Sequence, residues 1–180
     1  LTAGREFTLF ELPHGARAGV NICYEDAFPE ISRQFVRRGA NVLITLTNAA
    51  WYAESAGSRQ HLIHAVFRAA ENRRPLLRSG NNSDTCLILP GGRVVGLLYD
   101  LDTGSRFVRA ARCYDVPVWQ KQPYTFYTRY GDVFAKVCAL VMLLSWAGLA
   151  WRRFRDKQRL LRHVTGDGTA LGTAPMNGAA

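Results

Sequence analysis

Two short, nearly continuous apolar runs, at Arg17–Ile22 and Ala40–Leu46, predict two strands buried on both faces. Between them, Pro29–Arg38 places its apolar side chains on one side at helical spacing, and Gly39 follows in the position of a C-terminal cap. The three segments therefore predict a β-α-β unit with parallel strands and a right-handed crossover. Chemistry-bearing residues at the carboxyl ends of both strands then share one edge of the sheet.

A second helix is predicted over about Ser58–Arg74, where apolar residues recur every three or four positions until Pro75 ends the pattern. A hairpin is predicted next, with strands at Thr85–Leu89 and Arg93–Leu98 joined by a Pro-Gly-Gly turn. A further strand is predicted at 106–116. The chain is therefore expected to form an α/β domain over residues 1–116.

The remaining sequence changes character. Residues 117–132 are rich in proline and aromatic residues and are interpreted as a connector outside the core. Residues 133–151 carry one charge, Lys136, and are just long enough for a transmembrane helix, which needs about 20 apolar residues. A buried helix of a soluble protein is the alternative. The tail after Thr165 has few bulky apolar residues and is expected to be disordered.

The chain has 180 residues and is 48% hydrophobic, which suffices for one core-forming domain. Its start has neither an initiator methionine nor a signal-peptide pattern, so we expect the C-terminal portion of a longer protein. The net charge is +9, and much of the excess lies in the run from Arg152 to Arg159, directly after the apolar segment. This placement indicates a membrane boundary, with residues 152–180 cytoplasmic and the preceding domain outside, rather than a nucleic-acid site.

The four cysteines show neither CxxC pairing nor metal-ligand spacing, so we expect no metal, no cofactor and no disulfide. Cys23 is different from the others because it ends the first predicted strand and precedes a helix. A thiol there gains thiolate character from the positive end of the helix dipole. The alternative is an ordinary core thiol.

Several motifs in the right order and spacing resemble the nitrilase (carbon–nitrogen hydrolase) superfamily over roughly residues 2–116. The motifs are Thr2-Ala3-Gly4, Ile22-Cys23-Tyr24-Glu25-Asp26 with Phe28-Pro29-Glu30, Thr47 to Tyr52, Gln60-His61, Arg68 to Arg78, Asn81-Asn82 and Pro90-Gly91-Gly92. The resemblance implies the C-terminal part of an α-β-β-α sandwich. Ala3 and Ala49 depart from it, since they stand where proline and aspartate are common.

The resemblance also implies site residues. Cys23 is the nucleophile, and Tyr24 and Glu25 support it. Glu25 either bonds a catalytic lysine or holds the turn at the helix N-terminus. The superfamily's general base Glu and oxyanion-stabilising Lys lie upstream of the cysteine segment, and neither Glu6 nor Glu11 matches that position. The chain by itself is therefore expected to be catalytically incomplete and inactive.

Within the superfamily, the terminal apolar helix and the sequence motif Arg-Pro-Leu-Leu-Arg-Ser-x-Asn-Asn most resemble the apolipoprotein N-acyltransferase family. That resemblance implies acyl transfer, through a Cys23 thioester, from a phospholipid to the α-amine of the lipidated N-terminal cysteine of an apolipoprotein. It places the enzyme in the bacterial inner membrane, multi-pass in full length, with the catalytic domain periplasmic. Asn48, Trp51 and Tyr52 are expected to line the substrate pocket, the aromatic pair being otherwise ordinary core residues.

Two other functions are compatible with the same motifs. One is a membrane-anchored amidase of the nitrilase type, which admits water to the thioester. The other is a non-catalytic binding module that retains the fold. His61 and His64 are expected to be structural, and Glu71 is expected to form a buried ion-pair network with Arg73 or Arg78.

Overall fold

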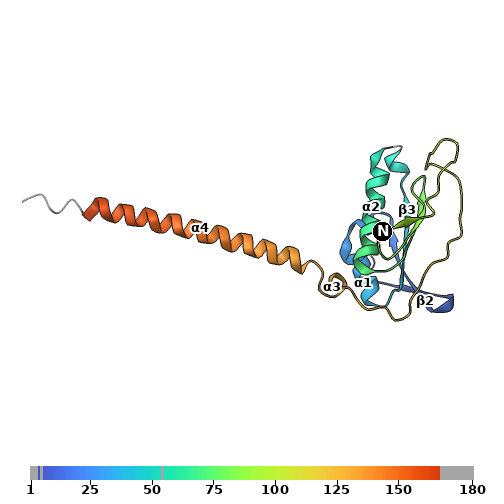
Figure 1. Cartoon of the computed structure of the whole chain (residues 1–180), viewed down its shortest axis with the longest axis horizontal. Coiled ribbons are helices and arrows are strands. Elements are labelled where there is room, and N and C mark those ends of the chain that lie inside the picture. Colours follow the sequence, from blue (N-terminus) through green and yellow to red (C-terminus); the bar gives the residue numbers. More distant parts are fainter. Residues whose placement is uncertain (1–3, 5, 54, 167–180) are drawn as a thin grey trace, which may run out of the picture. The chain divides into compact units, whose positions relative to one another are not determined.

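The computed structural model describes residues 4, 6–53 and 55–166. It divides into two compact units, one ending at Gly131 and the other starting at Asp132 (Figure 1). Thr2 and Ala3 of the first motif lie outside the described residues, as does the tail after Gly166 for which disorder is predicted.

The first unit contains one mixed six-stranded sheet whose strands lie in sequence order. Its strands are β1 (Leu9–Leu12), β2 (Ala16–Ile22), β3 (Val42–Asn48), β4 (Leu76–Asn81), β5 (Cys86–Ile88) and β6 (Val94–Val95). The strands β2, β3 and β4 are parallel, and the outer pairings are antiparallel. The predicted parallel β-α-β unit and the hairpin are confirmed, with shorter hairpin strands than expected.

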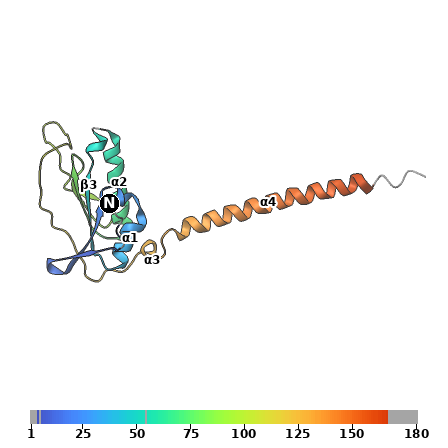
Figure 2. The same ribbon diagram turned by 180° about the vertical axis from the view of Figure 1, so that it is seen from behind.

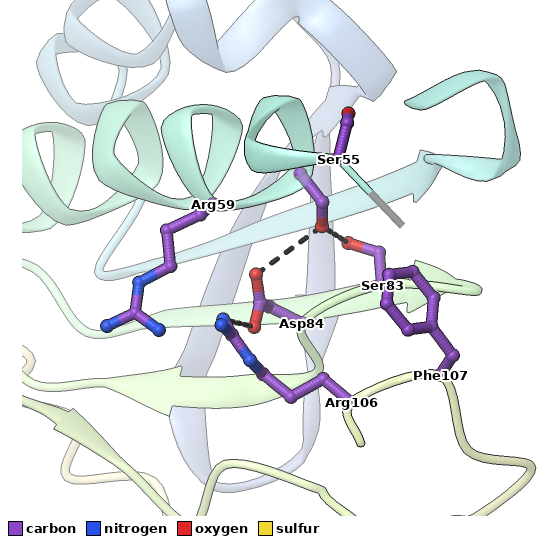
Figure 3. A pocket seen from close by; sticks show the side chains of 7 residues that line it. Ser55, Arg59, Ser83, Asp84, Arg106 and Phe107 are labelled. Carbon is purple, nitrogen blue, oxygen red and sulfur yellow. Dashed lines mark hydrogen bonds and ion pairs between the residues drawn. The ribbon is translucent and has the colours of Figure 1, made fainter. Parts of the chain in front are cut away.

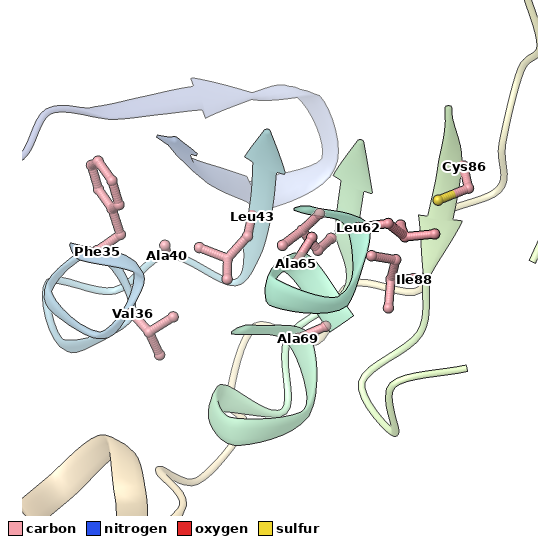
Figure 4. Close-up of a cluster of buried hydrophobic side chains, with 10 residues drawn as sticks. Phe35, Val36, Ala40, Leu43, Leu62, Ala65, Ala69, Cys86 and Ile88 are labelled. Carbon is pink, nitrogen blue, oxygen red and sulfur yellow. The ribbon is translucent and has the colours of Figure 1, made fainter. Parts of the chain in front are cut away.

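Helices connect the parallel strands on one face of this sheet. The helices of the unit are α1 (Pro29–Arg37), α2 (Ala56–Asn72) and α3 (Phe126–Tyr130), with short 3-10 segments η1 (Pro13–Gly15), η2 (Cys23–Ala27) and η3 (Ala50–Tyr52). Since the strand order advances in one direction, right-handed crossovers bring α1 and α2 to the same face. Figure 4 shows the core between these helices and the strands, where Phe35, Leu43 and Ala65 meet.

The opposite face of the sheet is also apolar. Strand alternation turns Val20 and Ile22 of β2, and Ile44 and Leu46 of β3, away from the helices. Ile22 is 55% exposed and Leu46 is 47% exposed. In an α-β-β-α sandwich this is the face that a second sheet covers, so the described sheet with its helix layer is one half of that fold.

The segment 106–116 is not a strand, so that prediction is wrong. The neighbouring edge strand β6 has only two residues and offers no ladder for another strand. Side-chain hydrogen bonds hold the segment against the domain instead. Arg106 Nη1 donates to Asp84 Oδ1 at 2.5 Å, and Tyr114 Oη donates to the Gly96 carbonyl at 2.7 Å.

The aromatic-rich connector packs against the α/β unit. The Arg33 side chain of α1 donates hydrogen bonds to the carbonyl oxygens of 127–129, at 3.0 to 3.2 Å. Thr128 is fully buried, and its Oγ1 donates to Asn72 Oδ1 of α2 at 3.0 Å. The compact unit therefore extends past 116 to Gly131.

In the part of the chain that the structure describes, the second unit consists of one helix, α4 (Val133–Gly166), drawn as one continuous ribbon in Figure 2. Its 34 residues span about 51 Å at 1.5 Å per residue, more than the ~30 Å of a hydrocarbon core. The stretch Val133–Arg159 is long and apolar enough to cross a membrane, by length and composition, and the helix continues through the basic run. Ser145 satisfies its hydroxyl internally by donating to the Val141 carbonyl at 2.8 Å.

Candidate active site at the carboxyl edge of the sheet

Cys23 occupies a sharp turn between strand and helix. The strand β2 ends at Ile22, and Cys23 begins η2, which leads into α1. Its φ of 53° lies in the left-handed region, which costs a residue other than glycine about 1–3 kcal/mol. The side chain is half-buried. A strained backbone at a half-buried thiol is the geometry of a nucleophile held on an elbow.

Thr47 is the β3 residue that contacts this thiol. Its Oγ1 donates to Cys23 Sγ at 3.5 Å, so β3 presents a hydroxyl to the sulfur. Asn48 follows one position later in β3. Because side chains alternate along a strand, Thr47 and Asn48 point to opposite faces of the sheet, and Thr47 is the one at the sulfur.

Asn48 lies at the same edge of the sheet in a different set of contacts. Its Oδ1 accepts hydrogen bonds from the Ala50 N–H at 3.2 Å and from Asn81 Nδ2 at 3.3 Å. Asn48 and Asn81 are directly paired in the β3–β4 register. Asn48 thus shapes the start of the loop that carries Trp51 and Tyr52, and its role in a substrate pocket stays a prediction.

The two aromatic residues of η3 differ in environment. Trp51 is 84% exposed, whereas Tyr52 is half-buried with its ring 6.0 Å from that of His61. Ala49 is completely buried, and its N–H donates to the Asn81 carbonyl at 3.2 Å. Trp51 is therefore not a core aromatic in the described structure, and its role in a substrate pocket stays a prediction.

Glu25 holds the turn. Its Oε2 accepts a hydrogen bond from the Ile22 N–H at 2.8 Å, which caps the start of η2. Tyr24 is half exposed, and its ring packs edge-on against Phe28 at 6.0 Å and lies 5.6 Å from the ring of His61. Glu25 therefore holds the turn, while a supporting role for Tyr24 and a bond from Glu25 to a catalytic lysine stay predictions.

A buried polar network lies beneath the elbow. Asp26 is fully buried, and it accepts from His61 Nε2 at 2.8 Å and from Arg78 Nη1 at 2.9 Å. His61 Nε2 also lies 3.2 Å from the Cys23 carbonyl oxygen. Asp26 was missed as a site residue, although it stands inside the motif that identified Cys23.

Glu71 forms an ion pair with Arg68, an arginine that was not among its expected partners. Its carboxylate accepts from Arg68 Nη2 at 2.9 Å, and the partner of Arg78 is Asp26. Arg68 also donates to the backbone carbonyls of Asp26 and Ala27, at 3.2 and 3.4 Å. Removing one partner of the buried Arg78–Asp26 pair would leave an unpaired buried charge, which costs about 3–5 kcal/mol.

A separate small cavity of about 110 Å³ lies near the start of α2 (Figure 3). Ser58 Oγ lies 3.1 Å from Ser83 Oγ and 3.4 Å from Asp84 Oδ2, and Arg106 pairs with the same carboxylate. Its lining does not include Cys23. Among the described residues, no cluster of histidine, cysteine and carboxylate side chains is arranged to hold a metal ion.

A sequence model of the carbon-nitrogen hydrolase family matches residues 1–105, more than half of the chain. The chain belongs to the carbon-nitrogen hydrolase family. The solved structure of a carbon-nitrogen hydrolase from Helicobacter pylori has a similar fold, with a TM-score of 0.50 and 13% identity over 54% of this chain and 41% of that one.

The chain is also similar to two curated bacterial enzymes. It is 39% identical over 137 residues to the apolipoprotein N-acyltransferase of Geobacter metallireducens. It is 35% identical over 151 residues to apolipoprotein N-acyltransferase 1 of Treponema denticola. The matches cover 76% and 84% of this chain but 25% and 26% of the relatives, so the chain spans about a quarter of their length.

Proposed function

We propose that this chain carries the nucleophile of an N-acyltransferase. The enzyme moves a fatty acyl chain from a phospholipid to the α-amine of the lipidated N-terminal cysteine of an apolipoprotein. The observation that carries the proposal is Cys23 in its left-handed elbow, with Thr47 at the sulfur and with relatives that are apolipoprotein N-acyltransferases.

The reaction has two half-reactions through one thioester. The Cys23 thiolate attacks the ester carbonyl carbon of the phospholipid, the ester C–O bond breaks, and the lysophospholipid leaves with a proton. The α-amine of the acceptor then attacks the thioester, the C–S bond breaks, and the amide forms as the amine loses its proton. The general base and the oxyanion stabiliser that the family resemblance implies are residues outside this chain.

The helix α4 supports access to a lipid substrate. A helix with the length and apolar composition to cross a membrane, followed by basic residues, anchors the domain at the surface from which phospholipid is drawn. We propose the bacterial inner membrane, with the Cys23 domain outside and the residues from Arg152 onward in the cytoplasm. The highly exposed Trp51 is suited to an apolar acyl chain.

The test uses the full-length enzyme with a phospholipid that carries a labelled acyl chain and a diacylated lipopeptide with a free α-amine. The wild type is expected to transfer the label to the lipopeptide. Cys23→Ala is expected to abolish transfer, because no thioester can form, and Cys23→Ser nearly so, because an alcohol is far less ionised than a thiol. Cys113→Ala serves as the matched control, since Cys113 is exposed and outside the site.

Two results would contradict the proposal. Undiminished transfer by Cys23→Ala would show that Cys23 is not the nucleophile. Release of free fatty acid by the wild type, with no labelled lipopeptide at saturating acceptor, would favour hydrolysis by water and hence the amidase alternative.

A further inference from the structure

We infer that Asp26, His61 and Arg78 form a positioning network that holds the Cys23 peptide in the orientation needed for acyl transfer. The inference rests on the proposed function and names the residues that maintain its nucleophile. They come from three elements, η2, α2 and β4, and none of the three is more than 2% exposed.

The network ends on the backbone of the nucleophile. Arg78 Nη1 donates to Asp26 Oδ2, and His61 Nε2 lies within hydrogen-bond distance of both Asp26 Oδ1 and the Cys23 carbonyl oxygen. Both partners of Nε2 are acceptors, so Nε2 carries the proton. The carboxylate of Asp26 thereby fixes the imidazole, and the imidazole fixes the Cys23 carbonyl.

Fixing that carbonyl has a geometric consequence. In a trans peptide the C=O and the following N–H point in opposite directions within one plane. Since the Cys23 carbonyl points toward the buried His61 side chain, the N–H of Tyr24 points in the opposite direction, away from His61. The left-handed φ of Cys23 persists only if its surroundings over-determine it, and the bond from His61 is one of these constraints.

The polar atoms of this network distinguish it from an ordinary hydrophobic core. His61 Nδ1 and Arg78 Nε and Nη2 are buried without a hydrogen-bond partner among the described residues. Apolar side chains of similar volume would leave no such unpaired atoms. What they could not supply is a donor aimed at the Cys23 carbonyl.

The experiment compares His61→Leu with His61→Gln in the full-length enzyme. The amide of glutamine can place a donor near the position of Nε2, whereas leucine keeps volume without a donor. We expect His61→Leu to lower kcat for acyl transfer by about 10²-fold, the scale of a misplacement of ~1 Å, with little change in KM. His61→Gln should recover most of that loss.

A second pair of variants controls for lost stability. Asp26→Asn removes the buried charge that orients His61. Asp84→Asn removes another buried carboxylate that is paired with an arginine, but whose contacts are to Ser58 and Arg106 and not to the Cys23 turn. Thermal unfolding is measured for every variant. We expect both to lower the midpoint of unfolding, and only Asp26→Asn to lower kcat. Equal kcat values for the two, or wild-type kcat in His61→Leu, would overturn the inference.

Alkylation of Cys23 by iodoacetamide gives a readout that needs no phospholipid. We expect slower alkylation in His61→Leu and Asp26→Asn than in His61→Gln and Asp84→Asn, because the elbow no longer holds the thiol in one position. If the wild type forms no thioester, the proposed function fails. The alkylation rates of the four variants still test whether the network positions Cys23. Equal alkylation rates in all four variants would contradict it.

Discussion

Cys23 and Cys86 are two thiols of one domain in opposite chemical environments. Cys23 is half-buried at the start of η2, whereas Cys86 is fully buried in β5 within the hydrophobic core. Burial raises the pKa of the Cys86 thiol to about 12 from an ordinary value of 9.0. Burial that opposes ionisation makes Cys86 a poor nucleophile, whereas the Cys23 side chain is partly exposed.

The first prediction follows from this contrast. In the folded full-length protein, iodoacetamide is expected to modify Cys23 and to spare Cys86 up to about pH 10, as measured by peptide mass mapping. Because the pKa of Cys86 is raised on folding, its stabilising contribution is complete below pH 9.0 and is lost as the pH rises toward 12. If Cys86 were modified at pH 8 as fast as Cys23, the burial of the Cys86 thiol would be contradicted.

The sequence revealed part of the site and missed the rest for a physical reason. Cys23, Tyr24 and Glu25 are contiguous, so a local motif identifies them. Thr47 and Asp26 act through partners that are distant in the sequence, since Thr47 reaches the sulfur from another strand and Asp26 bonds residues 35 and 52 positions away. A pattern of single residues does not show such pairs before the strand register is known.

At the scale of elements, the contact between β2 and α1 sets the position of the elbow. Gly19 of β2 faces Phe35 of α1, and a Cβ added at Gly19 would lie 2.5 Å from the Phe35 Cβ and 2.6 Å from its Cγ. These atoms are next to the helix backbone and cannot rotate away. The strand and the helix that flank Cys23 approach this closely only because residue 19 has no side chain.

We therefore expect Gly19→Ala to destabilise the domain by about 1–3 kcal/mol, the usual cost of overpacking. Gly91→Ala is the matched control, because a Cβ at Gly91 meets nothing within 4 Å. Thermal unfolding of the full-length protein measures both variants. Equal midpoints for the two would mean that α1 moves freely against the sheet.

The elements that were predicted correctly have clear local patterns: α1 has a one-sided apolar pattern, and the strands β2 and β3 have nearly continuous apolar runs. The strand β4 was not predicted, because its local pattern is interrupted by Arg78, whose burial depends on Asp26. The strand expected at 106–116 failed for the opposite reason: its local pattern was plausible, but the neighbouring edge strand β6 has only two residues. In both cases the outcome depends on residues or strands that are distant in the sequence, and a local pattern of apolar residues gives no information about them.

At the scale of the whole molecule, the proposed topology depends on α4 and its basic run. Reporter fusions at Gly104 and Gly166 of the full-length protein test it. We expect Gly104 to report the non-cytoplasmic side and Gly166 the cytoplasm, because basic residues are retained in the cytoplasm. The same compartment for both fusions would show that α4 does not cross the membrane.

The most direct test of the central claim is the mass of the acyl-enzyme. The purified full-length protein is incubated with phospholipid in the absence of an acceptor, digested, and examined by peptide mass spectrometry. We expect one fatty acyl group on the peptide that contains Cys23, lost on addition of a diacylated lipopeptide. An acyl group on Cys86 or Cys113, or none on any cysteine, would contradict the account.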